Sequence, residues 1–173
     1  MASTSDAAAT AINQSIHFAL PLKKYDVFIS FRGEDTRDNF TSHLHAALLQ
    51  HQLETFIDYR LQKGDDVWPS LVQAIQDSTV SLVIFSQNYA SSTWCLNELI
   101  EIMEQHNKKK GHVVVPVFFK IDPSHVRKQT HSYQTAFTKH EQDIKISCNM
   151  IHKWKETLFQ AANLSGFDSR VYR

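Results

Sequence analysis

The sequence has few cysteines, no long apolar run and no excess charge of either sign, and each lack excludes a class of protein. Its 2 cysteines, Cys95 and Cys148, lie far apart and form no CxxC pair. Neither a disulfide framework nor a zinc knuckle is therefore indicated, and a reducing, intracellular setting is the simpler interpretation. No apolar stretch approaches the roughly 20 residues that cross a bilayer, so no membrane partner is expected.

Charge and motif content exclude further classes. Basic and acidic side chains number 18 each, so no broad field indicates nucleic acid as a partner. The chain contains neither GxGxxG nor GxxxxGK, which argues against a dinucleotide-dependent redox enzyme and a P-loop NTPase. Ten histidines show no HExxH pattern, and His43 and His45 point apart on a predicted helix, so no metal site is expected.

A chain of 173 residues predicts one domain with a substantial core. Residues 1–23 differ in composition from the rest: they are rich in Ala, Ser and Thr, with one acid and no base before Lys23. They lack the basic start and unbroken apolar core of a signal peptide. We expect a disordered leader over 1–23 and a single folded domain over 24–173.

The stretch Tyr25–Phe31 is the predicted centre of the fold. It is rich in aromatic and β-branched residues, and its apolar side chains fall on both faces. This pattern is typical of an inner strand in a parallel sheet that helices cover on both sides. Arg32 and Gly33 follow directly, at the carboxyl end of the strand, where open α/β sheets bind their ligands.

Strands and helices alternate along the rest of the chain, which predicts a doubly wound α/β fold. A charged loop at 58–66 is a candidate gate over the site. Pro116 argues for an edge strand or a bulge, and 122–127 reads as a turn. Further strands are expected at 53–57, 79–85, 113–119 and 167–173, and helices at 35–51, from 67, at 94–108, 133–140 and 149–164.

Three motifs together resemble plant Toll/interleukin-1 receptor (TIR) domains: Tyr25–Arg37 (YDVFISFRGEDTR), Ser86–Leu99 (SQNYASSTWCLNEL) and Val117–Gln129 (VFFKIDPSHVRKQ). The resemblance implies a flavodoxin-like fold: a doubly wound parallel sheet of five strands in the order 2-1-3-4-5, with helices on both faces. The chain is similar to the amino-terminal module of nucleotide-binding, leucine-rich-repeat immune receptors, or to a TIR-only relative. The family's last helix, which usually follows the segment matching Gly166–Arg173, is not expected here.

The resemblance also implies cleavage of NAD+, with Glu98 as the catalytic residue. Trp94 and Glu98 are four residues apart and so share one face of a predicted helix. That face is offset from the apolar stripe of the helix, so Glu98 is expected outside the core. Breaking the nicotinamide–ribose bond builds positive charge on the ribose, which a carboxylate can stabilise. The substrate contacts implied by the resemblance come from Phe31, Arg32, Gly33, Lys63, Gly64 and Trp94.

Two functional classes remain open: an NAD+ glycohydrolase or cyclase that signals in plant immunity and cell death, and a non-catalytic module that recruits other TIR domains. NAD+ or NADP+ would be substrate, and no cofactor is expected. The resemblance places self-association at Ser42, His43 and Gly166, which otherwise read as a helix surface pair and a helix C-cap. By default Arg32 and Arg37 would be surface arginines paired with Glu34 or Asp35. The expected location is cytoplasmic or nucleocytoplasmic.

Overall fold

The computed structural model describes residues 23–57 and 67–171. The predicted leader up to residue 22 and the predicted gate at 58–66, which includes Lys63 and Gly64, lie outside the described residues. Lys23, the last residue of the predicted leader, lies against the sheet and donates a hydrogen bond from Nζ to the Ser78 carbonyl at 3.0 Å.

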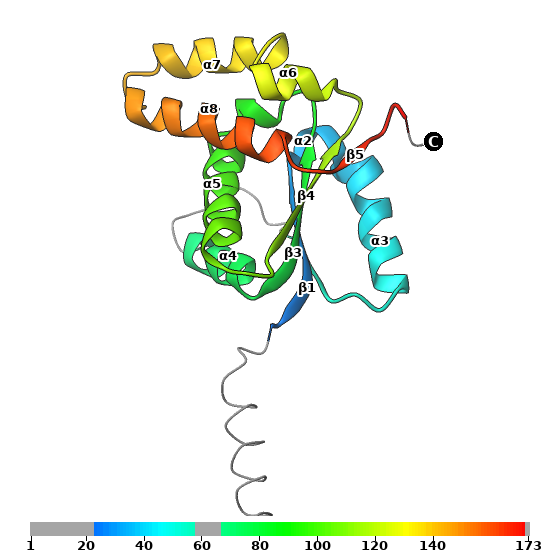
Figure 1. The fold of residues 1–173 in the computed structure, drawn as a ribbon. Helices are drawn as coiled ribbons and strands as arrows, with labels where there is room; N and C mark the ends of the chain where they lie inside the picture. Colours follow the sequence, from blue (N-terminus) through cyan, green and yellow to red (C-terminus); the bar gives the residue numbers. More distant parts are fainter. Residues whose placement is uncertain (1–22, 58–66, 172–173) are drawn as a thin grey trace, which may run out of the picture.

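One parallel sheet organises the described chain, and its strand order β2-β1-β3-β4-β5 confirms the expected order (Figure 1). β1 and β3 are the long central strands, whereas β2 and β5 are short edge strands. The five strands are β1 Tyr25–Phe31, β2 Thr55–Ile57, β3 Ser78–Phe85, β4 Val113–Phe118 and β5 Phe167–Asp168.

Helices cover both faces of the sheet, as the alternating pattern predicts. Figure 1 shows α3 alone on one side, and α4 and α5 on the other, with α6, α7 and α8 near the carboxyl ends of the strands. The helices are α2 Gly33–Thr36, a π-helical turn Arg37–Thr41, α3 Ser42–Gln50, α4 Val67–Gln76, a 3₁₀ turn Tyr89–Ser91, α5 Thr93–Lys108, α6 Pro123–Lys128, α7 Ser132–Gln142 and α8 Cys148–Ala162.

Alternate residues of β1 point to opposite faces and build two apolar clusters. Ile29 and Phe31 lie in the smaller cluster, which is covered by Leu44 and Leu48 of α3. Phe28 lies in the larger cluster, with the buried faces of α4, α5 and α8. The central strand is therefore buried on both faces, and its carboxyl end is fixed in position.

Two local predictions are wrong. The segment 122–127 is not a turn, because Asp122 caps the helix α6 by accepting a hydrogen bond from the Ser124 N–H at 2.8 Å, with Pro123 in the first turn. β4 is not an edge strand, because it lies between β3 and β5. Pro116 is tolerated there because β5 pairs only with Val117 and Phe118, which come after it.

Gly166 does not cap a helix either. α8 ends at Ala162, and its C-cap is Asn163. A Cβ placed on Gly166 would overlap the Pro116 carbonyl oxygen and lie 2.6 Å from the Pro116 ring. The glycine therefore permits the close approach of the segment before β5 to β4.

In the described part of the chain, no helix is both long and apolar enough to span a bilayer.

Candidate functional site

The carboxyl end of β1 turns directly into a helix, and this turn forms one wall of a cavity. Arg32 keeps extended backbone angles at the N-cap, and α2 begins at Gly33. A Cβ on Gly33 would lie 3.0 Å from Arg37 Cζ and closer still to its Nη2 atom. The absence of a side chain at Gly33 therefore lets the Arg37 guanidinium fold back over the turn.

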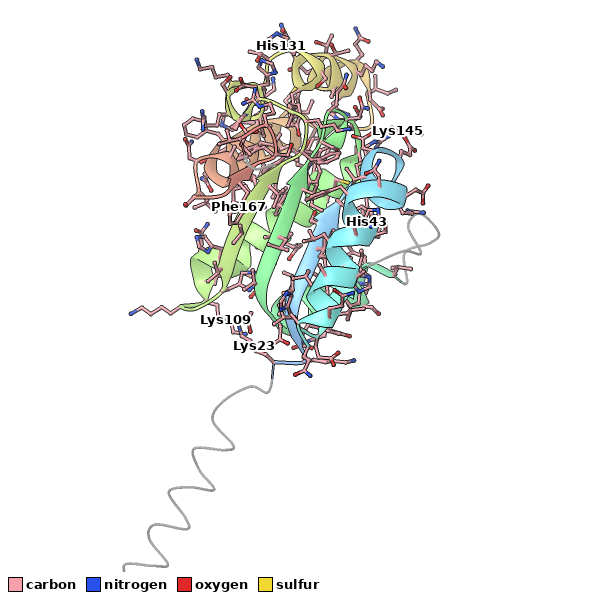
Figure 2. All side chains as sticks on the ribbon, turned by 90° about the vertical axis from the view of Figure 1, so that its right-hand side faces the viewer. Lys23, His43, Lys109, His131, Lys145 and Phe167 are labelled. Carbon is pink, nitrogen blue, oxygen red and sulfur yellow. The ribbon has the colours of Figure 1, made fainter. Side chains whose placement is uncertain are left out.

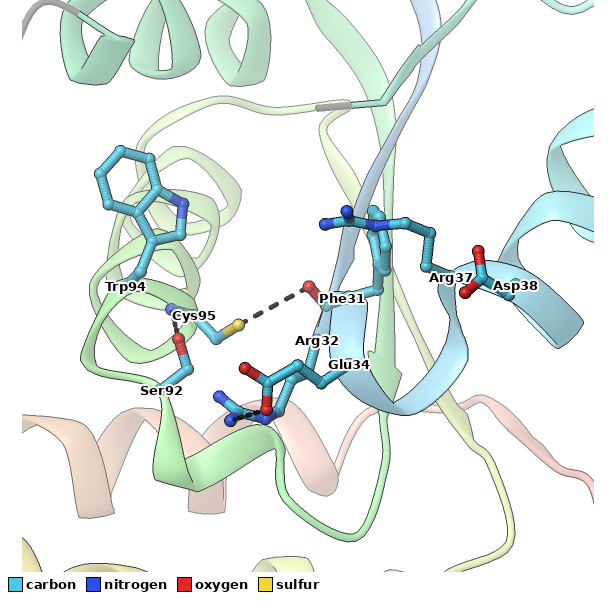
Figure 3. Close-up of a pocket in the computed structure, with 9 residues that line it drawn as sticks. Phe31, Arg32, Glu34, Arg37, Asp38, Ser92, Trp94 and Cys95 are labelled. Carbon is cyan, nitrogen blue, oxygen red and sulfur yellow. Dashed lines mark hydrogen bonds and ion pairs between the residues drawn. The ribbon is translucent and has the colours of Figure 1, made fainter. Parts of the chain in front are cut away.

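The first turn of α5 forms the opposite wall. Ser92 caps α5 by accepting a hydrogen bond from the Cys95 N–H at 3.2 Å, and this fixes Trp94 beside the cavity. Figure 3 shows side chains from both walls around the space between β1 and α5. The cavity measures about 270 Å³ and is lined by Phe31, Arg32, Gly33, Glu34, Arg37, Asp38, Ser92, Trp94 and Cys95.

Three buried N–H donors in this cavity lack hydrogen-bond partners. They are Arg32 Nε, Arg37 Nε and Trp94 Nε1, and no other buried side-chain nitrogen or oxygen of the described residues lacks a partner. A buried donor left unpaired costs about 1–3 kcal/mol, so native proteins keep few of them. Three such donors on residues that line one cavity favour a ligand with acceptor oxygens at this place.

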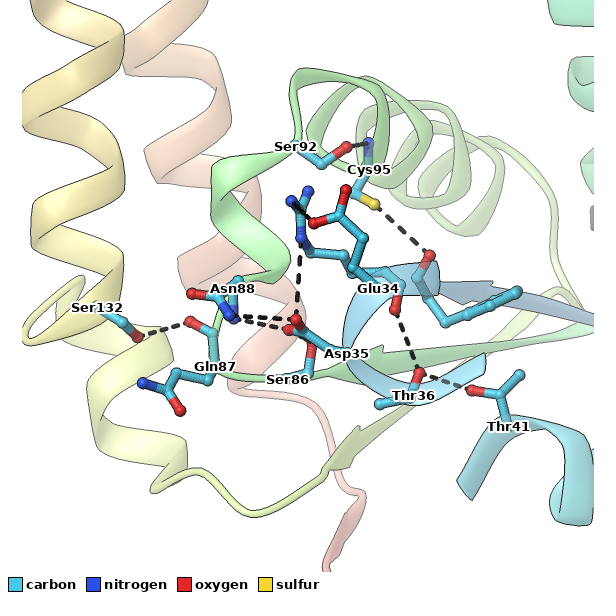
Figure 4. Close-up of polar contacts among 12 residues, drawn as sticks. Glu34, Asp35, Thr36, Thr41, Ser86, Gln87, Asn88, Ser92, Cys95 and Ser132 are labelled. Atoms are coloured by element: carbon cyan, nitrogen blue, oxygen red, sulfur yellow. Dashed lines mark hydrogen bonds and ion pairs between the residues drawn. The ribbon is translucent and has the colours of Figure 1, made fainter. Parts of the chain in front are cut away.

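The two carboxylates after Arg32 have different surroundings (Figure 4). Asp35 accepts hydrogen bonds from Ser86 Oγ at 2.6 Å, from the Asn88 N–H at 2.9 Å and from Asn88 Nδ2 at 3.1 Å, and lies 4.0 Å from Arg32 Nε. It joins the turn after β1 to the loop after β3. Glu34 instead extends over the cavity and pairs with Arg32 Nη2 at 2.6 Å. The default pairing of Arg32 with Glu34 is thus present in this structure.

Trp94 and Cys95 have contacts that limit what each can do. The Trp94 ring packs edge-on against Trp68 of α4, with centroids 5.1 Å apart. Cys95 Sγ lies 3.6 Å from the Phe31 carbonyl oxygen. Burial, with a smaller contribution from the charge of Glu98, raises the pKa of the Cys95 thiol to about 12. Cys95 is therefore a wall residue rather than a nucleophile.

The helical pattern predicts that Glu98 lies outside the core, and this prediction is wrong. Glu98 is buried, with 5% of its surface exposed. α5 packs against the sheet and is flanked by α4 and α8, so little of its middle is left for solvent. Glu98 is also not among the residues that line the cavity. Burial is the main cause of the raised pKa values of Tyr89 and Cys95, and the negative charge of Glu98 adds to both, so the carboxylate lies near these two residues.

A buried tyrosine, which the sequence analysis did not single out, joins the two walls. Tyr89 Oη donates to the Cys95 carbonyl at 3.1 Å and shares a hydrogen bond with Ser30 Oγ at 2.9 Å. Burial holds the pKa of Tyr89 well above its usual value, so the neutral phenol is the form that makes these bonds. Tyr89 thereby fixes the distance between the end of β1 and the start of α5.

The structure brings together four of the expected substrate-binding residues: Phe31, Arg32, Gly33 and Trp94. It adds Arg37, which the sequence analysis treated as a surface arginine by default. The signal available in the sequence was its position in the first motif, four residues after Gly33 and inside the helix expected at 35–51. The remaining additions are Glu34, Asp38, Ser92 and Cys95.

The residues expected at self-association surfaces lie away from the cavity. Ser42 is the first residue of α3, and His43 beside it is exposed on the outer surface of that helix (Figure 2). Gly166 is exposed next to β5. Within the described ranges, no group of three or more His, Cys, Asp or Glu side chains is arranged to hold a metal ion.

A second hollow of about 360 Å³ lies among α6, α7 and α8. Gln129 Nε2 donates to the Arg127 carbonyl at 2.9 Å and to two more carbonyls. Lys155 Nζ lies 2.7 Å from Glu141 Oε1 and 5.2 Å from the centre of the Phe137 ring. This α6–α8 groove is larger than the cavity, and the charged and amide groups described here have partners.

Comparison with known proteins gives consistent matches. The family model described as TIR domain matches residues 24–173. Disease resistance protein RUN1 of Vitis rotundifolia is 50% identical over 145 residues, which cover 83% of this chain and 11% of the relative. TMV resistance protein N of Nicotiana glutinosa is 48% identical over 143 residues, which cover 82% of this chain and 12% of the relative. The chain thus spans about a tenth of the length of these curated relatives.

Among solved structures, the TIR domains of the activated Roq1 resistosome, which directly recognises the pathogen effector XopQ, match with a TM-score of 0.78 and 47% sequence identity. The match covers 86% of this chain and 90% of that chain. The strand order fits this likeness. The chain therefore belongs to the TIR domain family, and it is similar to the TIR domains of plant disease resistance proteins.

Proposed function

We propose that this TIR domain is an NAD+ nucleosidase, which cleaves the nicotinamide–ribose bond of NAD+ and releases nicotinamide and ADP-ribose-type nucleotides. One observation carries the proposal. Three buried donors without hydrogen-bond partners belong to Arg32, Arg37 and Trp94, which all line the cavity at the carboxyl end of the central strand. A dinucleotide supplies the pyrophosphate oxygens that such donors bind.

The chemistry assigned to Glu98 is electrostatic. Departure of nicotinamide leaves positive charge on the ribose, and a carboxylate beside that ribose stabilises the transition state. Because Glu98 is 5% exposed, its charge acts in a medium from which water is largely excluded, where it has more effect than in water. Arg32 and Arg37 would hold the pyrophosphate, and the Trp94 ring would contact the nicotinamide or the base.

Self-association is the second part of the proposal. Glu98 is buried and does not line the cavity in the single chain, so a ligand in the cavity does not touch it without a rearrangement. We infer that assembly with other TIR domains, through surfaces that include Ser42, His43 and Gly166, brings the carboxylate into contact with the substrate. Signalling in plant immunity and cell death, and a cytoplasmic or nucleocytoplasmic location, belong to this proposal.

The test is NAD+ consumption by the purified chain over a range of protein concentrations. We expect a rate that rises more than linearly with concentration and falls about 100-fold or more in Glu98→Gln. Glu101→Gln is the matched control, because it makes the same substitution about one turn further along α5, and it should retain the rate. Equal rates in Glu98→Gln and the unsubstituted protein would falsify the catalytic assignment.

The burial of Glu98 also favours a second candidate function, a non-catalytic module that associates with other TIR domains. This alternative predicts concentration-dependent assembly without loss of NAD+ at any concentration. Sedimentation measured on the same samples separates the two functions. Assembly that His43→Ala weakens, with NAD+ unchanged throughout, would support the interaction module.

A further inference from the structure

Arg32 and Glu34 form an ion pair in which the two partners are very unequally exposed. Arg32 Nη2 lies 2.6 Å from Glu34 Oε2, and the side chains are 18% and 70% exposed, respectively. Both side chains line the cavity, and the more exposed carboxylate is paired with the guanidinium there (Figure 3). Glu34 therefore occupies the face of Arg32 that a ligand entering from solvent would meet.

The neighbouring Asp35 shows that Glu34 is not needed to hold the turn. Asp35 receives three hydrogen bonds from Ser86 and Asn88 and joins two loops. In the described part of the chain, the hydrogen bond and the ion pair of Glu34 are both made with Arg32. An exposed carboxylate with this single ionic contact can leave without disturbing the scaffold.

The charges that line the cavity cancel. Arg32 and Arg37 supply two positive charges, and Glu34 and Asp38 supply two negative ones. An anionic ligand therefore meets a cavity whose lining side chains carry no net charge, and in which Arg32 is already paired with Glu34. Binding of a phosphate to Arg32 Nη2, the nitrogen that donates to Glu34, requires that the Glu34 carboxylate move away, because the two anions would compete for the same N–H group and repel each other.

We propose that the Glu34 carboxylate competes with a phosphate-bearing ligand for the Arg32 guanidinium. The carboxylate pairs with Arg32 until a ligand displaces it, and it thereby lowers the affinity of the cavity for anions. This inference rests on the proposed function in requiring a phosphate-bearing ligand at Arg32. Glu34 thereby sets how strongly the site selects for ligand charge, and Glu34→Gln should bind phosphates more tightly.

The experiment is calorimetric titration of the full chain with ADP-ribose, which carries the pyrophosphate but lacks the nicotinamide bond. We expect Glu34→Gln to bind about three- to fivefold more tightly than the unsubstituted protein, since exposed ion pairs contribute up to about 1 kcal/mol, which corresponds to about fivefold. The gain should shrink as salt is raised. Asp38→Asn removes the same charge from the cavity without breaking the pair, and should gain about twofold or less.

Each outcome decides the inference. Unchanged or weaker binding by Glu34→Gln overturns it, and so does an equal gain in Glu34→Gln and Asp38→Asn, which would indicate only the general field. Binding of ADP-ribose by neither protein also overturns it. Failure of the proposed function is recognised separately, as NAD+ that remains uncleaved at every protein concentration, whatever the titration shows. Equal thermal unfolding of the variants establishes that the fold is intact.

Discussion

The cavity between β1 and α5 and the α6–α8 groove are both concave and polar, but they differ in how their donors are used. The groove is larger, about 360 Å³ against about 270 Å³. In the groove, Gln129 and Lys155 are bonded within the chain. In the cavity, three buried donors have no partner. We therefore rank the cavity above the groove as the candidate ligand site, because its lining residues carry unpaired buried donors.

The difference has a physical origin. Folding normally pairs buried donors because an unpaired one costs about 1–3 kcal/mol. In the groove, carbonyl groups at the end of α6 and in α8 are close enough to accept from Gln129. In the cavity, the Tyr89 bridge between Ser30 and Cys95 joins the two walls, and no described acceptor reaches Arg37 Nε or Trp94 Nε1. A ligand is the natural acceptor for them.

The largest expected effect comes from exchanging a cation in each hollow. Arg37→Gln should weaken ADP-ribose binding about 10- to 100-fold, because a hydrogen bond from a charged donor contributes about 1.5–3 kcal/mol. Lys155→Gln removes a cation from the groove and should leave that affinity unchanged. Titration calorimetry on both variants checks this. A loss with Lys155→Gln as large as with Arg37→Gln would remove the distinction between the two hollows.

Two glycines sharpen the comparison by separating binding from stability. Gly166→Ala should lower the free energy of unfolding by about 2 kcal/mol and the melting temperature by about 4–8 °C, because the new Cβ meets the backbone of Pro116. Gly33→Ala meets only the end of the flexible Arg37 side chain. Its stability should change by less than about 0.5 kcal/mol.

Ligand binding should follow the opposite order. Gly33→Ala displaces the Arg37 guanidinium and should weaken ADP-ribose binding about fivefold, roughly 1 kcal/mol. Gly166→Ala, once folded, should retain the affinity. Thermal unfolding and titration of the same two samples give both numbers. A destabilised Gly33→Ala with normal affinity would show that Arg37 does not depend on the open space at Gly33. Because Gly166→Ala is expected to destabilise the fold, weaker self-association of Gly166 variants would not by itself place Gly166 at an interface.

The smallest expected effect is the pH dependence of stability, which originates away from the cavity. Burial, with a smaller effect from the charges of Lys23, His106 and Lys109, holds the pKa of His112 below its usual value. The unfolded chain binds this proton below about pH 6.5, whereas the folded chain resists it. Stability should therefore fall as the pH drops below 6.5, by at most about 1.4 kcal/mol per pH unit. Urea unfolding between pH 7.5 and 5 measures it.

His112→Gln is the control, since it removes the titration and keeps a side chain that can bond to Ser81. A second loss is expected below about pH 4, where unfolded carboxylates become protonated. In the folded protein, hydrogen bonds to Ser124 and then to Arg170 lower the pKa of Asp122, and Arg170 lowers the pKa of Asp168, so their contribution is present above that pH and is lost below it. If His112→Gln loses the same stability as the unsubstituted protein between pH 7.5 and 5, another group is responsible for the pH dependence.

Most of the fold followed from periodicity. The long strands at β1 and β3 and the helix α5 were expected within one or two residues, because side chains buried on one face repeat at fixed spacings. Helix α6 was missed because its six residues are too few to show a period, although Asp122 and Pro123 are start signals that could have revealed it. The position of Pro116 depended on how far the short strand β5 extends, which no local pattern encodes.

The site divides in the same way. Phe31, Arg32, Gly33 and Trp94 could be assigned from motifs that lie at the ends of predicted elements. The burial of Glu98 could not be inferred from its own helix, because it results from α4 and α8 packing on either side. Arg37 entered the site because a glycine four residues earlier leaves room for its side chain.

By itself, the sequence determined the alternation of strands and helices, the central position of β1 and the residues that surround its carboxyl end, since these depend on local spacing and composition. Only the tertiary structure decided which polar groups remain unpaired and that Glu98 is buried and does not line the cavity. Those properties depend on distances between elements far apart in the chain, such as the separation that Tyr89 fixes between β1 and α5.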